Sequence, residues 1–263
     1  MSKTRKVLLI LLALALLAFP IRWLLAAMLP DASVDPVPSC VAGMLLSLVT
    51  LGLPAWLLRP WTSPRLPRAR TALPGMAMGA LAAVLIRGGF TMVDKAWQQA
   101  LNLAPAFVPV PESLPLAIVY VAALVIVPAL TEEAFFRGAL LTGLLDGSRR
   151  ATAVLLTALT FVLMHGSLAN LPSLLALSLL LTLLMLGTGH IAVPITMHLC
   201  YNLTALGWNA IPDWLGGMCC GASVTLGWYL LFCQPGVVHP PMKLRDGLIA
   251  AAAVIALILS YLL

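Results

Sequence analysis

Long runs of uncharged apolar residues recur along the whole chain, and they constrain its fold more than any other feature. A helix of about 20 apolar residues spans the roughly 30 Å of hydrocarbon in a bilayer. Hydrophobic residues make up 62% of the sequence and charged residues only 9%, which excludes an ordinary soluble domain. We therefore predict transmembrane helices over these ranges: 7–29, 39–58, 73–93, 113–130 with its continuation to about 146, 151–169, 171–187, 191–210, 217–233 and 247–263.

The predicted fold class is all-α, a polytopic transmembrane helical bundle of eight or nine helices joined by short connections. Lysine and arginine gather in alternate loops of this pattern: Lys3, Arg5, Lys6, Arg59, Arg65, Arg68, Arg70, Arg149, Arg150, Lys243 and Arg245. Because basic residues concentrate on the cytoplasmic side, we predict a cytoplasmic N-terminus and outer loops at 30–38, 94–112 and 210–216. The net charge of +6 then reflects topology, and no nucleic-acid partner is predicted.

Two carboxylates and a guanidinium lie within six residues of one apolar span, at Glu132, Glu133 and Arg137. An ionisable group at bilayer depth costs several kcal/mol unless it is paired, so its presence indicates a functional site. Glu133 and Arg137 are four residues apart and can form an ion pair on one helical face. Glu132 points about 100° away from Glu133, towards a cavity in which it could act as a general base.

Two further polar patterns follow within predicted spans. Phe161 and His165 are four residues apart on one helix, and His198 and Asn202 are four apart on another. Side chains at this spacing project from the same helical face. Taken alone, a single histidine on an apolar helix is more typical of hydrogen-bonded packing than of catalysis, and His-x-x-x-Asn is a weak pattern.

Together and in this order, the three patterns resemble the CPBP family of intramembrane proteases (CAAX-processing and bacteriocin-processing, also called Abi). That family's signature is Glu-Glu-x-x-x-Arg, then Phe-x-x-x-His, then His-x-x-x-Asn. The positions that carry it here are Glu132, Glu133, Arg137, Phe161, His165, His198 and Asn202. The resemblance implies a CPBP-like catalytic core at 113–210, between motif-free N-terminal transmembrane helices at 1–112 and C-terminal transmembrane helices at 211–263.

The resemblance also implies roles for these residues. Glu132 and His165 would activate a water molecule, while His198 and Asn202 would position that water or stabilise the oxyanion. Glu133 and Arg137 would orient the helix. The implied function is an intramembrane endopeptidase that cuts a membrane-anchored or membrane-inserted polypeptide, in a bacterial-type inner (cytoplasmic) membrane.

Two alternatives stay open. Glu132, His165 and His198 could ligate a catalytic zinc with water as the fourth ligand, although no His-Glu-x-x-His pattern occurs. We favour metal-independent water activation and predict no cofactor. The second alternative is a non-catalytic immunity or binding protein on the same scaffold. A transporter is disfavoured, because the ionisable residues gather in one stretch rather than in two similar halves.

Two arginines lie within predicted spans apart from this cluster. Arg22 is close enough to a helix end for its side chain to reach the interface. Arg87 lies in the third span, where a helix C-terminus, a lipid headgroup or a substrate carboxylate could pair with it.

Overall fold

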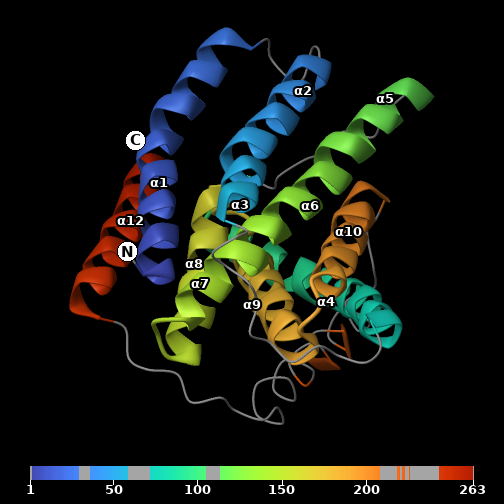
Figure 1. The fold of residues 1–263 in the computed structure, drawn as a ribbon. Coiled ribbons are helices and arrows are strands. Elements are labelled where there is room, and N and C mark those ends of the chain that lie inside the picture. The colour runs from blue at the N-terminus through green and yellow to red at the C-terminus, as the bar shows by residue number, and fades with distance from the viewer. Residues whose placement is uncertain are drawn as a thin grey trace. The chain divides into compact units, whose positions relative to one another are not determined.

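The protein is described from a computed structural model in which every regular element of the described residues is helical (Figure 1). The described residues are 2–29, 36–58, 72–104, 113–207 and 243–262, with 218, 219, 221, 222 and 225. The helices are α1 (Lys3–Met28), α2 (Pro36–Ser47), η1 (Leu48–Gly52), α3 (Leu53–Leu58), α4 (Ala72–Ala100), α5 (Leu114–Tyr120), η3 (Val121–Ile126), α6 (Val127–Glu133), η4 (Ala134–Leu141), α7 (Thr142–Leu145), α8 (Arg150–His165), α9 (Leu171–Thr188), α10 (Ala192–Gly207) and α12 (Leu244–Leu262).

Several of these elements join end to end, where π-helical segments (η) interrupt α-helix. α2, η1 and α3 form one rod, and α5 to α7 form another. Among the described residues, four helical rods are long and apolar enough to cross a membrane: Pro36–Leu58, Leu73–Ala100, Leu114–Leu145 and Leu171–Thr188. The predicted all-α membrane bundle is confirmed, and the chain is an integral membrane protein. The helix predicted over 217–233 lies largely outside the described residues.

α4 and α8 end at residues that differ from their predicted ends. α4 continues to Ala100, past the end predicted at residue 93, so Asp94 and Trp97 belong to a helix rather than to a loop. α8 ends at His165, before the predicted end at residue 169. Gly166 follows with φ 61°, a left-handed conformation that glycine adopts without strain and that commonly ends a helix.

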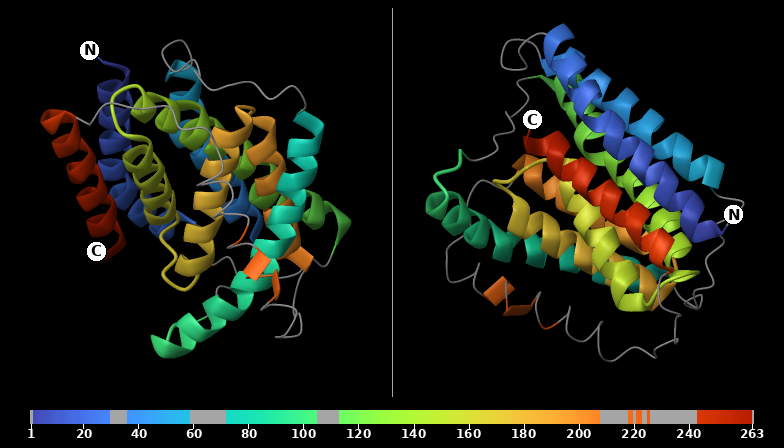
Figure 2. Two further views of the ribbon diagram at one scale, coloured as in Figure 1. Left: turned by 90° about the horizontal axis from the view of Figure 1, so that it is seen from below. Right: turned by 90° about the vertical axis from the view of Figure 1, so that its left-hand side faces the viewer.

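The chain divides into two compact units, the first made of 1–65, 111–164 and 237–263 and the second of 66–110 and 165–236. In the first unit α1 packs along α12, so the first and last described helices lie side by side (Figures 1 and 2). The predicted division at 112 and 210 rests on the signature rather than on these contacts, and stays a prediction.

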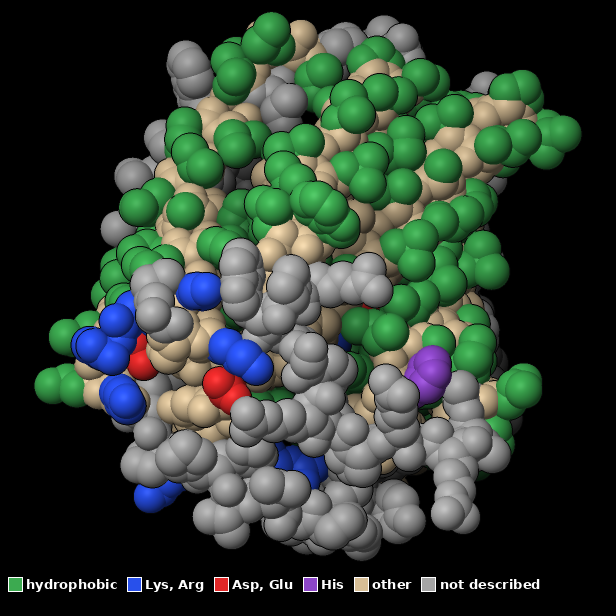
Figure 3. Space-filling view, in the orientation of Figure 1, with side chains coloured by type: hydrophobic (Ala, Val, Ile, Leu, Met, Phe, Trp, Pro, Cys, Tyr) green, Lys and Arg blue, Asp and Glu red, His purple; other side chains and the backbone are tan. Residues whose placement is uncertain are grey.

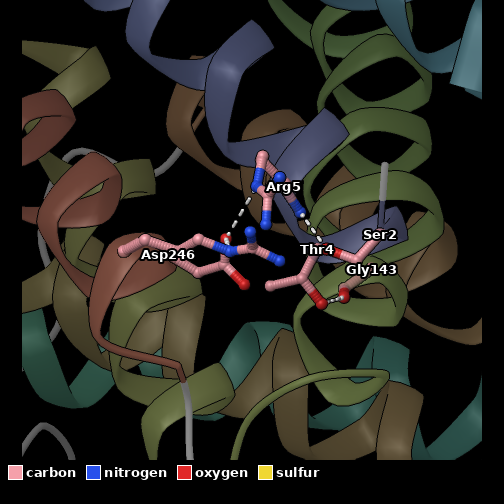
Figure 4. A network of polar contacts seen from close by, with 6 residues as sticks. Ser2, Thr4, Arg5, Gly143 and Asp246 are labelled. Atoms are coloured by element: carbon pink, nitrogen blue, oxygen red, sulfur yellow. Dashed lines mark hydrogen bonds and ion pairs between the residues drawn. The ribbon is translucent and has the colours of Figure 1, made fainter.

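The start of α1 forms hydrogen bonds to α12 and to the rod that carries Glu132. The Thr4 hydroxyl donates to the carbonyl of Gly143 at 2.8 Å, and Arg5 Nε donates to Asp246 Oδ1 at 3.2 Å (Figure 4). These bonds bring the starts of α1 and α12 to the same end of the unit as the end of α7. Lys and Arg side chains gather at that end (Figure 3), as the topology prediction requires, and the compartment that it faces stays a prediction.

Gly143 permits this close approach, because a Cβ there would lie 2.8 Å from both Val7 methyl carbons. We expect Gly143→Ala to lower the free energy of unfolding by about 1–3 kcal/mol, since the β-branched Val7 has little room to move. Thermal unfolding in detergent measures this. Gly43→Ala is the matched control, because its Cβ would meet nothing within 4 Å, and it should not destabilise the protein. Equal loss in both variants would contradict the packing account.

In the second unit, polar side chains near the end of α4 hold the segment that leads into α9. Asp94 accepts a hydrogen bond from the backbone N–H of Ser173 at 3.1 Å. Trp97 Nε1 donates to the Leu168 carbonyl at 2.9 Å and Gln98 Nε2 to the Ala169 carbonyl at 3.0 Å. These bonds satisfy backbone groups at the start of α9, and they explain why the polar end of α4 is helical.

Candidate active site

Glu133 and Arg137 form an ion pair inside the rod Leu114–Leu145. Arg137 Nη1 donates to Glu133 Oε1 at 2.9 Å, and both side chains are 0% exposed. Removing two charges from water is expensive, and their mutual attraction offsets this only when geometry is good. The pair predicted from the four-residue spacing is present at a depth where neither residue could remain charged alone.

Aromatic rings surround this guanidinium. The Arg137 Cζ lies 4.7 Å from the centroid of the Phe161 ring and 5.8 Å from that of Phe136. The Phe136 ring meets Phe161 edge-on at 5.1 Å and Phe135 at 5.2 Å. Cation–π and edge-to-face contacts therefore attach α8 to η4. Sequence reasoning placed Phe161 only on the face of His165 and missed its contact with Arg137, which nothing local in the sequence reveals.

Glu132 differs from its neighbour in exposure, being half-buried where Glu133 is fully buried. This difference agrees with two side chains that leave the helix in different directions. The preceding residue, Thr131, shares a 2.5 Å hydrogen bond with Ser47 Oγ, and its methyl carbon lies close to Gly52. The rod of α2 and η1 thus packs against the turn that presents Glu132.

The backbone is π-helical on both sides of α6. The N–H of Val127 donates five residues back to Ala122 at the end of η3, and Pro128 follows with no N–H of its own. η4 begins immediately after Glu133 and contains Arg137. Such segments are rare and occur often at functional sites. The helix type therefore changes on either side of the segment that ends with the two carboxylates.

The second unit contains the remaining polar residues of the signature. His198 lies on α10 and is 1% exposed, while Asn202, one turn later, is half-buried. Tyr201, which lies between them in sequence, is buried. His165 is the last residue of α8 and the first of the second unit, and its side chain is exposed.

A comparison with known protein families shows which family these residues resemble. Residues 114–204 match the family described as Type II CAAX prenyl endopeptidase Rce1-like, which is part of the CPBP family, and this range contains every signature residue. The match therefore supports the resemblance to the CPBP family over this range, which is less than half of the chain. No curated protein and no solved structure matches the chain.

The matched range is similar to a family of membrane proteases, and membrane-embedded helices suit a membrane-associated substrate. The matched range includes α5 to α10, whereas α1 to α4 and α12 lie outside it. The Glu-Glu-x-x-x-Arg and Phe positions belong to the first unit, and the two histidines and the asparagine to the second. That the residues of both units act on one substrate is a proposal.

The zinc alternative requires side chains of His, Cys, Asp or Glu that lie close enough together to bind one metal ion. Within the described parts of either unit, no three His, Cys, Asp or Glu side chains are grouped as metal ligands. In the first unit the fully buried carboxylate, Glu133, is paired with Arg137. A catalytic zinc site needs three protein ligands and an open position. The three ligands of the zinc alternative come from both units, so metal-independent water activation stays a prediction.

Proposed function

We propose that this chain is an intramembrane endopeptidase in which Glu132 activates a water molecule. The observation that carries the proposal is the buried Glu133–Arg137 pair next to the half-buried Glu132, within a span matched to a protease family. The pair holds two charges at a depth where packing alone would favour apolar residues. Its position next to Glu132 suits a residue pair that orients a general base.

The proposed reaction is hydrolysis of one peptide bond. Glu132, assisted by His165, takes a proton from water as the water oxygen attacks the carbonyl carbon. The tetrahedral intermediate carries a negative charge on its oxygen, to which His198 and the Asn202 amide donate hydrogen bonds. Such donors stabilise developing charge more strongly in a site that excludes water. The C–N bond then breaks, and the leaving amine takes the proton held by Glu132.

Glu133, Arg137 and Phe161 act on this chemistry through position. The ion pair fixes the last turn of α6 and the first turn of η4, between which Glu132 is presented. Phe161 fixes α8, whose last residue is His165, against the same guanidinium. A fixed base keeps its alignment with the water, and misplacement by about 1 Å can lower a rate by about a hundredfold.

The proposed substrate is a polypeptide that is anchored or inserted in the membrane. The proposed location is a bacterial-type inner membrane, with the N-terminus in the cytoplasm. Basic residues at one end of the first unit support this orientation. Because no cofactor is invoked, activity should survive prolonged dialysis against a chelator.

The decisive test maps protein termini in cells. Wild type and Glu132→Gln are expressed in a strain of the source organism that lacks the gene, and membrane and secreted fractions are analysed by mass spectrometry. We expect a new terminus only with the wild type, which identifies the substrate and the bond that is cut. Identical termini with both proteins, together with a host phenotype that survives the substitution, would contradict the protease and favour the immunity or binding function.

A further inference from the structure

Arg87 is a charged residue inside a membrane-spanning helix and outside the CPBP match. It lies about 20 Å from either end of Leu73–Ala100 at 1.5 Å per residue. This is farther than an arginine side chain extends, so the helix-end partner considered from sequence does not suit it. A cation at this depth indicates a functional group whose partner has to be found.

The structure places an aromatic ring next to Arg87, which forms no ion pair among the described residues. Its Cζ lies 5.7 Å from the centroid of the Tyr201 ring. Its Nε is buried and has no hydrogen-bond partner among the described residues. Asp94, on the same helix, attracts the charge of Arg87 without forming an ion pair with it, and its carboxylate accepts the hydrogen bond from the Ser173 N–H. A buried donor left without an acceptor is costly and suits a site completed by a ligand.

The location of Tyr201 links Arg87 to the proposed chemistry. Tyr201 precedes Asn202 directly and follows His198 by three residues on α10. Two glycines of α4 bring the helices together, since a Cβ on Gly79 would lie 3.0 Å from the Val193 carbonyl oxygen, and Gly75 lies similarly close to the Val193 side chain. α4 is therefore held tightly against α10, which fixes Arg87 beside the turn that carries the proposed oxyanion donors.

We infer that Arg87 binds a carboxylate of the substrate within a few residues of the bond that is cut. A guanidinium binds a carboxylate through two parallel hydrogen bonds, which are stronger and more directional than neutral ones. The carboxylate is either the C-terminus of the polypeptide or an Asp or Glu side chain. Arg87 is thus a specificity residue. This inference rests on the proposed function, because it assumes that substrate lies against α10.

The test measures binding of defined lipopeptides to the full-length protein in detergent. Three probes share an N-dodecanoyl-Ala-Leu-Ala sequence: one with a free C-terminal carboxylate, one with a C-terminal amide, and one amide with Glu in place of Leu. Dissociation constants are measured by calorimetry in a Glu132→Gln background, which keeps the probes uncut. We expect at least one carboxylate probe to bind about tenfold more tightly than the neutral amide. The carboxylate probe that binds more tightly shows whether Arg87 prefers a C-terminal or a side-chain carboxylate.

Variants then assign this preference to Arg87. Arg87→Gln should remove the difference between probes, and Arg87→Lys should retain part of it. Arg5→Gln is the control, because Arg5 pairs with Asp246 in the first unit, and it should keep the full preference. Equal binding of all three probes to the parent, or a preference that survives Arg87→Gln, would overturn the inference. If Arg87→Gln does not fold, the probe preferences of the parent and of Arg87→Lys still test the inference.

Binding is read without turnover, so this result is separate from the terminus mapping. A changed terminus together with equal binding of the probes would leave the protease in place and remove the role of Arg87. A carboxylate preference that depends on Arg87, found with unchanged termini, would support the site and contradict the hydrolytic function.

Discussion

We expect Glu132→Gln to abolish peptide hydrolysis and to leave the amount of folded protein unchanged. Glutamine keeps the shape of glutamate but cannot take a proton from water, and a general base contributes about 10²–10⁴-fold to a rate. We therefore expect kcat to fall by at least about a hundredfold. The measurement is the turnover of purified protein in nanodiscs on the substrate found by terminus mapping, with thermal unfolding as the check on folding.

Asp146→Asn is the matched control for this change. It makes the same carboxylate-to-amide substitution in the turn that follows α7, outside the signature. Its turnover should stay near that of the wild type. Near-normal kcat in Glu132→Gln would show that another group is the base, and a similar fall in both variants would show that the effect is not specific to Glu132.

Arg137→Ala lowers the amount of folded protein instead. The substitution leaves the fully buried Glu133 carboxylate without its guanidinium, and it removes the cation that lies over the Phe161 ring. Breaking a buried pair by removing one partner costs about 3–5 kcal/mol, because an uncompensated charge is left behind. We expect a lower yield of protein from membranes and a lower melting temperature in detergent.

A double substitution separates the charge effect from lost packing. Glu133→Leu combined with Arg137→Met removes both charges and keeps similar volumes, and such replacements are often tolerated. Its melting temperature should recover much of what Arg137→Ala loses, while turnover stays low, because the turn that presents Glu132 has lost its ion pair. An Arg137→Ala protein as stable as the wild type would contradict the structural role of the pair.

Sequence correctly predicts those features of the site that depend on residues close together on one helix. Glu133 and Arg137 are four residues apart, so helical geometry alone brings them together. The different exposure of Glu132 follows from the same geometry. The helices of the bundle were also predictable, because crossing hydrocarbon requires long apolar runs and satisfied backbone groups.

The non-local contacts had no signal in sequence. Phe161 was assigned to the histidine on its own helix, whereas its ring lies against Arg137 on another rod. Residues 94–98 read as a loop because they are polar. They are helical because Asp94, Trp97 and Gln98 bond to the segment that leads into α9.

The sequence by itself determined that this chain is a membrane-spanning helical bundle with a protease signature, because hydropathy and residue spacing act within single helices. Only the tertiary structure decided which distant groups each helix meets. The Thr4 hydroxyl donates to the Gly143 carbonyl, and Arg87 lies over the Tyr201 ring. The physical reason is that contacts between helices depend on how closely their backbones approach. That approach is set by glycines and buried polar bonds far apart in the chain.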